Sequence, residues 1–299
     1  MSASTVLRTV LATSPLSMPL KQGDIHSPRI KLDFVDVAPV HKAFAPMVRK
    51  QAYDVCELAI VTCLQAIAYK RPIVALPAVV ASRFQRGCLI GYGPRGVLLP
   101  QDLAGKRVGV RSYTQTTGMW VRAHLTEDYG LATERIRWVT RDPAHVEEYR
   151  DPAFVEHTMG EKSLPDMLRD GEIDAAILGN DLPDGDEFVP LIADAKSRDL
   201  AWSNTHGFVP INHMVVASRD CCDRDPDAVR EAYNLLREAD RLLPTPNDGY
   251  RTTLFGFEQL RAPVEWIIDA CVEQGLLPRR LGIDEVFGPA EKILGVLPV

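Results

Sequence analysis

The chain has 299 residues, of which 46% are hydrophobic and 25% charged, so it can fold into one large domain or two compact lobes. Its formal net charge of −6 excludes a general basic surface for nucleic acid or an anionic membrane, so any anion-binding site must be local. The sequence has no run of about 18 apolar residues, which excludes a membrane-spanning helix.

The six cysteines have neither metal-binding nor disulfide-like spacing. They include no C-x-x-C pair, and the vicinal pair Cys221 and Cys222 does not suit an ordinary disulfide. The N-terminal segment MSASTVLRTVLATSPLSMPL lacks the long apolar region and the cleavage site of a signal peptide. We therefore expect reduced thiols and a cytoplasmic location.

The first ninety residues predict an α/β domain. Alternating or valine-rich runs predict strands over 5–13, 30–37 and 72–80. The segment 41–52 has helical spacing, and 53–70 passes from a short buried strand into an apolar helix. This order of strands and helices is typical of an α/β fold.

A second α/β unit is predicted from about residue 107. The pattern gives strands over 107–110, 136–140 and 175–178, with helices over 116–129 and from about 163 to Gly171. In such a sheet, ligands bind beyond the carboxyl ends of the strands. The glycine-rich stretch GYGPRG, Gly91 to Gly96, is interpreted as part of a hinge between lobes. A further strand over 208–220 and several helices complete the chain.

The stretch RVGVRSYTQTTGMW, Arg107 to Trp120, predicts an anion site. A strand leads through a polar turn into a helix whose first turn offers backbone N–H groups, a positive dipole end and threonine hydroxyls. The alternative is that one threonine only caps the helix and that Gln115 is solvated. The candidate ligand-binding residues of this stretch are Arg111, Tyr113, Gln115, Thr116 and Thr117.

Three arginines follow predicted strands and are candidate carboxylate clamps: Arg83, Arg86 and Arg111. The guanidinium group stays charged and can grip a carboxylate through two hydrogen bonds. The alternative for each is a solvated surface arginine.

Glu57 and His213 are the candidate acid–base residues. Glu57 precedes an apolar helix, where capping of that helix is the alternative role. His213 lies in the apolar strand PINHMVV, where a buried structural histidine is the alternative, and it could deliver a proton because histidine titrates near neutral pH. His206 is a weaker candidate.

Motifs for other chemistries are missing. The seven histidines show no H-x-x-x-H, H-x-H or H-E-x-x-H spacing, although a metal bound by residues distant in sequence stays open. The sequence has no nucleotide-binding glycine motif and no G-x-S-x-G, which argues against nucleotide-dependent and serine-hydrolase chemistry.

Several of these segments resemble one family. AGKRVGV, GEIDAAILGN and FVPINHMVVASRD resemble the type II periplasmic solute-binding fold. YDVCELAI, ASRFQRG and FVPINHMVV are similar to the FDV-S/C-E, PSR-x-FRH and FPI-x-H segments of the 4,5-dihydroxyphthalate decarboxylase group within it. The chain departs from that group at Gly87, where the group has histidine, and at Arg111, where proline or glutamate is usual nearby.

The resemblance implies an α/β fold of two lobes with the ligand in the cleft between them. Lobe one would comprise residues 1–92 and 207–299, and lobe two residues 93–206. It also implies a cytoplasmic carboxy-lyase that acts on a hydroxylated aromatic carboxylate without an organic cofactor. Arg83 and the helix start at Thr116 and Thr117 would hold one carboxylate, Glu57 would take part in proton transfer, and His213 would protonate the ring.

Two other functions share these features. A non-catalytic solute-binding protein would use the same arginines and helix start, while a lyase of the chorismate-dehydratase type has the same fold but motifs that are not recognised here. The expected partner is a small aromatic carboxylate. A homodimer through the helical, proline-rich tail from Pro278 is a further expectation.

Overall fold

The computed structural model describes residues 4–158, 160–179, 183, 185–246 and 249–295. Its strands form two six-stranded sheets. In spatial order, the first sheet contains β12 (Leu254–Phe255), β4 (Ile73–Ser82), β11 (Ile211–Ser218), β3 (Val55–Ala59), β1 (Thr5–Val10) and β2 (Ile30–Phe34). The second contains β10 (Phe188–Pro190), β5 (Leu89–Tyr92), β9 (Ala175–Ile177), β6 (Arg107–Val110), β7 (Arg137–Thr140) and β8 (Val155–His157).

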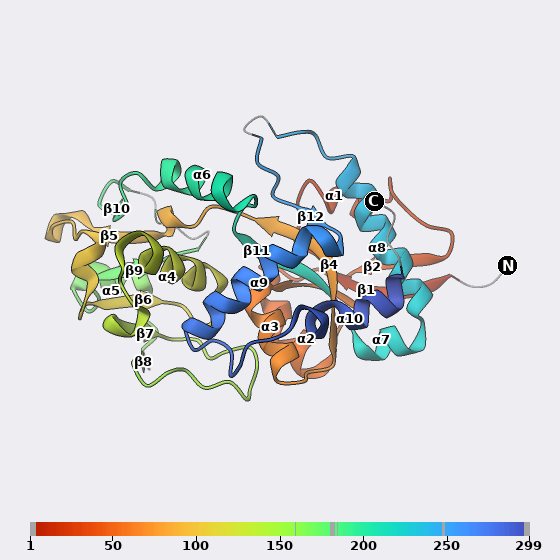
Figure 1. Ribbon diagram of the computed structural model, residues 1–299, viewed down its shortest axis with the longest axis horizontal. Helices are drawn as coiled ribbons and strands as arrows, with labels where there is room; N and C mark the ends of the chain where they lie inside the picture. Colours follow the sequence, from red (N-terminus) through yellow and green to blue (C-terminus); the bar gives the residue numbers. More distant parts are fainter. Residues whose placement is uncertain (1–3, 159, 180–182, 184, 247–248, 296–299) are drawn as a thin grey trace.

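Helices pack around both sheets, as Figure 1 shows. The α-helices are α1 (Met18–Gln22), α2 (Phe44–Lys50), α3 (Ile60–Ala68), α4 (Thr116–Tyr129), α5 (Leu164–Asp170), α6 (Ala195–His206), α7 (Arg219–Arg224), α8 (Pro226–Arg241), α9 (Phe257–Glu273) and α10 (Ile283–Leu294). Short 3-10 turns are η1 (Val40–Ala43), η2 (Arg86–Cys88), η3 (Gly93–Arg95), η4 (Pro100–Leu103) and η5 (Thr133–Arg135). No helix among the described residues has the length and apolarity needed to cross a membrane.

The best-predicted elements are those with a clear local signal. Strand β6 and helix α4 have the predicted bounds, and α5 ends before Gly171, whose left-handed φ of 77° terminates the helix as predicted. Strand β1 is shorter than predicted. The chain leaves the sheet after Val10 because the Ala12 N–H donates to Glu57 and the Ala12 carbonyl accepts from Ser17.

Two short segments carry the chain between the sheets. Residues 83–88 lead from β4 into β5, and residues 207–210 lead from α6 back into β11. They are joined because Arg83 N–H donates to the Pro210 carbonyl at 3.0 Å, and the Gln85 amide donates to Asn212 Oδ1 at 2.5 Å. The prediction that GYGPRG forms a hinge is wrong: this stretch begins within β5 of the second sheet, and Gly93 N–H donates to the carbonyl of Glu187, which directly precedes β10 of the same sheet.

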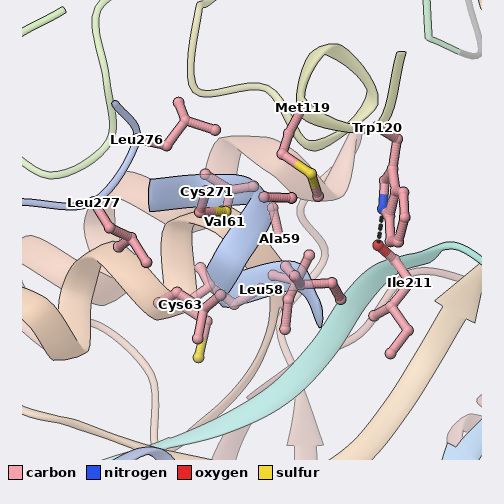
Figure 2. Packing of buried hydrophobic residues seen from close by; sticks show 14 of the residues in the cluster. Leu58, Ala59, Val61, Cys63, Met119, Trp120, Ile211, Cys271, Leu276 and Leu277 are labelled. Carbon is pink, nitrogen blue, oxygen red and sulfur yellow. Dashed lines mark hydrogen bonds between the residues drawn. The ribbon is translucent and has the colours of Figure 1, made fainter. Parts of the chain in front are cut away.

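One hydrophobic core runs through both sheets. Leu58, Val61 and Cys63 of the first sheet and α3 cluster with Met119 and Trp120 of α4 (Figure 2). The six cysteines are buried free thiols, as expected. Burial of such apolar surface stabilises by roughly 25 cal/mol per Å², so this core resists separation of the two sheets.

Polar contacts also connect α4 to the start of β11 and to Gln274, the residue that caps the C-terminal end of α9. The Trp120 indole donates to the Ile211 carbonyl at 2.8 Å. Buried Arg122 donates to Gln274 Oε1 at 2.7 Å, and the Gln274 amide donates to the Met119 carbonyl at 3.0 Å. Helix α9 therefore bridges from the first sheet to α4, as its course in Figure 1 indicates.

Candidate functional site

A cavity of about 230 Å³ lies between the two sheets. The first-sheet side contributes the end of β3, the start of α3 and the start of β11, while the second-sheet side contributes the start of α4 and Gly179, two residues beyond β9. The lining residues are Pro39, Val40, His41, Phe44, Ala59, Thr62, Arg83, Arg111, Thr114, Gln115, Thr116, Thr117, His145, Gly179, Asn212 and His213. A larger cavity of about 370 Å³ behind the crossing segments contains none of the predicted residues.

The start of α4 forms one wall of this cavity, as the sequence predicts. Its N-cap residue Gln115 makes no side-chain capping bond, so the alternative of a simple threonine cap does not hold. Thr116 is 4% exposed, and its Oγ1, like Gln115 Oε1, is buried without a hydrogen-bond partner among the described residues. Thr117 Oγ1 accepts a hydrogen bond of 2.9 Å from the Arg83 guanidinium. Unsatisfied buried polar atoms are costly, so this wall is suited to a polar ligand.

The charge of the lining favours an anion. Arg83 and Arg111 contribute two guanidinium groups, and no aspartate or glutamate lies among the described lining residues. Arg111 has a loose contact, 3.8 Å from its NH1 to Asp142 Oδ2, and both side chains are partly exposed. The helix dipole adds a positive potential at the same wall.

Glu57 and His213 form a hydrogen-bonded pair at the first-sheet wall. In the antiparallel pairing of β3 with β11, His213 lies opposite Ala59 and Val215 opposite Glu57, so Glu57 and His213 are diagonal neighbours on one face. His213 Nδ1 lies 2.6 Å from Glu57 Oε1, while Glu57 Oε2 accepts from the Ala12 N–H at 2.7 Å.

This pairing assigns different tasks to the two residues. Glu57 is 4% exposed and does not line the cavity, and the N-cap of α3 is Ala59, so Glu57 is not a helix cap. His213 lines the cavity. With Nδ1–H directed at Glu57, the other ring nitrogen, Nε2, is the one left for chemistry. Glu57 acts through His213 by fixing its tautomer and orientation.

The cavity also contains residues that sequence patterns did not indicate. Burial, together with the nearby Arg111 and His41, lowers the pKa of His145 to about 4, so His145 is neutral at pH 7. Its Nδ1 lies 2.8 Å from Thr62 Oγ1. Phe44 packs edge-on against His145 and His213, with ring centroids 5.6 and 5.3 Å away. These residues come from segments without a local motif, and only the fold brings them together.

Arg86 lies away from the cavity, contrary to expectation. It is 1% exposed, donates to Asp128 through Nε at 2.8 Å and to Asp199 through NH1 at 2.8 Å, and lies 3.5 Å from His124 Nε2. Both aspartates come from helices over the second sheet, α4 and α6. We call Arg86, Asp128, Asp199 and His124 the buried ion-pair cluster; it is a structural element that holds η2 against these helices.

The side chains of Tyr113 and His206 also make their contacts away from the cavity. Tyr113 is fully buried, and its hydroxyl donates to the Gln274 carbonyl at 2.8 Å. Burial raises the pKa of this phenol to about 12. His206 stacks on Trp202 with ring centroids 4.0 Å apart. Neither side chain lines the cavity. Within the described part of the chain, no group of three or more histidine, cysteine, aspartate or glutamate residues could hold a metal ion.

The fold class is that of the type II periplasmic solute-binding proteins. The alkanesulfonate-binding protein SsuA of Xanthomonas axonopodis pv. citri has a TM-score of 0.58 at 16% identity, covering 97% of this chain and 99% of that one. The aliphatic sulphonate-binding protein SsuA of Escherichia coli has a TM-score of 0.61 at 15% identity, covering 95% and 92%. The predicted α/β solute-binding fold is confirmed.

Sequence similarity points to a particular group. The 4,5-dihydroxyphthalate decarboxylase of Comamonas testosteroni is 27% identical over 91% of this chain and 93% of that protein. The 4,5-dihydroxyphthalate decarboxylase of Pseudomonas putida is 30% identical over 53% of this chain and 64% of that protein. No family model matches. The resemblance drawn from the sequence motifs is thereby confirmed.

Proposed function

We propose that the protein is a carboxy-lyase that removes carbon dioxide, without oxidation, from a hydroxylated aromatic carboxylate similar to 4,5-dihydroxyphthalate. The observation that carries this proposal is the Glu57–His213 pair in the wall of a cavity that also contains Arg83 and the start of α4. A binding site for an anion needs the cationic wall but has no need of an oriented acid–base pair. The named relatives support the same activity.

Arg83, Thr117 and the start of α4 bind one carboxylate, which places the ring across the cavity toward His213. A ring hydroxyl ortho or para to the departing carboxylate releases electron density into the ring as its O–H bond is polarised. Protonated His213 then transfers its Nε2 proton to the ring carbon that carries this carboxylate.

Cleavage of the carbon–carboxylate bond returns its electron pair to the ring, and carbon dioxide leaves. The product has a C–H bond at that carbon, and His213 regains a proton from solvent, so one proton is consumed for each carbon dioxide released. Glu57 stabilises the charged imidazole through Nδ1 and keeps the ring oriented. The scheme uses no organic cofactor.

A solute-binding protein for a small aromatic carboxylate is the second candidate function. It is favoured by one observation, namely that two solved structures with this fold are sulfonate-binding proteins. The cytoplasmic location is part of the enzyme proposal, and it is supported by the six free thiols.

The experiment that separates the two functions measures carbon dioxide release and ligand-induced thermal shift on the same samples. The purified protein is incubated with a panel of hydroxylated phthalates and benzoates, each with and without an added divalent metal ion. Release from a hydroxylated member supports the enzyme and shows whether a metal contributes. Thermal shifts throughout the panel without any release would replace the enzyme by a binding protein.

A further inference from the structure

His145 joins the second-sheet side of the cavity to the first-sheet side. It lies in the loop after β7 of the second sheet, and this loop is held where Asp142 N–H donates to the Arg111 carbonyl at 2.8 Å. On the first-sheet side, the His145 carbonyl accepts from Arg49 Nε of α2 at 2.8 Å, and His145 Nδ1 lies 2.8 Å from Thr62 Oγ1 of α3. These contacts fix the position of the imidazole in the cavity wall.

The hydrogen bond to Thr62 determines which nitrogen of His145 carries the hydrogen. Thr62 is 1% exposed, and its hydroxyl has no other hydrogen-bond partner among the described residues. The hydroxyl therefore donates to Nδ1, because a buried hydrogen left without an acceptor is costly. A neutral imidazole that accepts at Nδ1 carries its hydrogen on Nε2. Since Nε2 makes no hydrogen bond within the described part of the chain, this N–H can be donated to a ligand.

The surroundings of this donor are cationic. The low pKa of the His145 imidazole has burial as its main cause, and Arg111, His41 and Arg49 as further causes. Arg111 lines the same cavity, and its ion pair with Asp142 is loose at 3.8 Å. A neutral N–H donor beside a guanidinium group suits an oxygen that bears negative charge.

We propose that His145 and Arg111 form the receptor for a ring hydroxyl of the substrate, which they bind in its ionised form. The phenolate oxygen accepts from His145 Nε2–H beside the Arg111 guanidinium, and the hydroxyl proton passes to solvent. The inference rests on the proposed function and deepens it, because a phenolate releases more electron density than a neutral hydroxyl to the ring carbon that His213 protonates. The product regains the hydroxyl proton from solvent, so the net uptake stays at one proton for each carbon dioxide.

The positions of the two imidazoles agree with this assignment. Phe44 packs edge-on against His145 and His213, with ring centroids 5.6 and 5.3 Å away. Both imidazoles line the cavity, so they lie on neighbouring parts of its wall. One substrate ring in the cavity then has its hydroxyl at His145 and its departing carboxylate at His213.

The test is the ionisation of a bound chromogenic phenol, 4-hydroxy-3-nitrobenzoate. Its carboxylate suits the cationic lining, its phenolate absorbs visible light more strongly than its phenol, and its electron-withdrawing nitro group opposes protonation of the ring. Absorbance titration against pH, with the probe saturated by protein, gives the ionisation constant of the bound phenol. A purely structural role of His145 would change the affinity for the probe but not this constant.

Two variants remove the proposed contacts. His145→Leu removes the donor, and Arg111→Met removes the cation from a partly exposed side chain, so the latter should fold normally. His145→Gln retains an amide that can accept from Thr62 and donate to the probe. The matched control is His26→Gln, at an exposed histidine outside the cavity whose Nδ1 lies 3.1 Å from the Gly23 carbonyl.

In the wild type and in His26→Gln, the bound probe should ionise roughly tenfold more readily than the free probe, or better, because a hydrogen bond and a nearby cation both favour the anion. His145→Leu and Arg111→Met should each lose most of this gain, while His145→Gln should keep most of it. Arg111→Met keeps the test decisive should His145→Leu not fold.

Three results would overturn the inference: a probe that ionises in the wild-type protein as it does in solution, an unchanged gain in either His145→Leu or Arg111→Met, or no binding of the probe by the wild type. Carbon dioxide release from a hydroxylated phthalate is measured separately. The hydroxyl receptor and the decarboxylase activity can therefore fail independently.

Discussion

Two clusters in this protein combine an arginine, a histidine and carboxylate side chains, with opposite consequences. The cavity cluster consists of Arg83, His213 and Glu57, and the buried ion-pair cluster consists of Arg86, His124, Asp128 and Asp199. In the buried ion-pair cluster, the Arg86 guanidinium forms ion pairs with Asp128 and Asp199, so these charges neutralise one another. In the cavity cluster the carboxylate of Glu57 lies behind His213, and Arg83 lines the cavity together with the start of α4; no aspartate or glutamate is among the lining residues that the structure describes.

The comparison teaches that the partners, and not the residue types, decide whether such a cluster is structural or functional. Arg83 and Arg86 belong to one short segment, yet the aspartates that neutralise Arg86 come from two helices distant in sequence. Burial and Arg86 lower the pKa of His124 well below its ordinary value, so His124 is neutral and has no part in proton transfer. The following predictions test whether the buried ion-pair cluster is structural and the cavity cluster functional.

The largest expected effect on stability comes from Arg86→Met. The substitution leaves two aspartates uncompensated in a buried environment, and breaking a buried pair in this way costs about 3–5 kcal/mol. Urea unfolding should show this loss in the free energy of unfolding, while ligand affinity of the folded protein stays close to that of the wild type. A loss below about 1 kcal/mol would mean that the cluster behaves like an exposed ion pair.

Arg83→Met should have the complementary effect. Removal of this cation should weaken binding of an aromatic dicarboxylate by about 2 kcal/mol or more, because a charge-assisted contact to a buried carboxylate is lost. The free energy of unfolding should change much less than in Arg86→Met. Calorimetric titration with phthalate, run beside urea unfolding of both variants, measures the contrast. Equal losses of stability in the two variants would contradict this assignment of the two clusters.

The smallest effect concerns the pH dependence of stability. Burial lowers the pKa of His145 to about 4 from an ordinary value of 6.5, so the unfolded chain binds a proton there more readily than the folded protein. The contribution of His145 to stability is present above pH 6.5 and is lost as the pH falls toward 4. By pH 5 the loss in the free energy of unfolding is about 2 kcal/mol. The lowered pKa of His124 acts in the same direction.

The measurement is the change in unfolding free energy between pH 7 and pH 5, in wild-type protein and in His145→Gln. The variant should lose less stability on acidification, because glutamine does not titrate. Identical slopes in the two proteins would show that His145 already binds a proton in the folded state.

Local sequence signals predicted the strand–turn–helix around α4 and the helix stop at Gly171, because caps and periodicity act over a few residues. The position of Glu57 before an apolar helix and the family resemblance of the segment around His213 indicated these two residues, which the structure brings into contact. Local signals could not show that Arg83 lines the cavity while Arg86 does not, or that Tyr113 lies away from it. They also could not identify His145, Thr62 and Gly179 as lining residues. Those outcomes depend on contacts between segments far apart in the chain.

The most direct test of the account is decarboxylation in D₂O, followed by NMR, with wild-type protein and His213→Ala. For a hydroxylated phthalate, the account predicts one carbon dioxide for each product molecule and a single deuterium at the ring carbon that lost the carboxylate. It predicts a fall in turnover of roughly 10²- to 10⁴-fold in His213→Ala with substrate affinity within a few fold. Unchanged turnover in His213→Ala would contradict the role of His213 as proton donor, and tight binding without product in the wild type would contradict the enzyme itself.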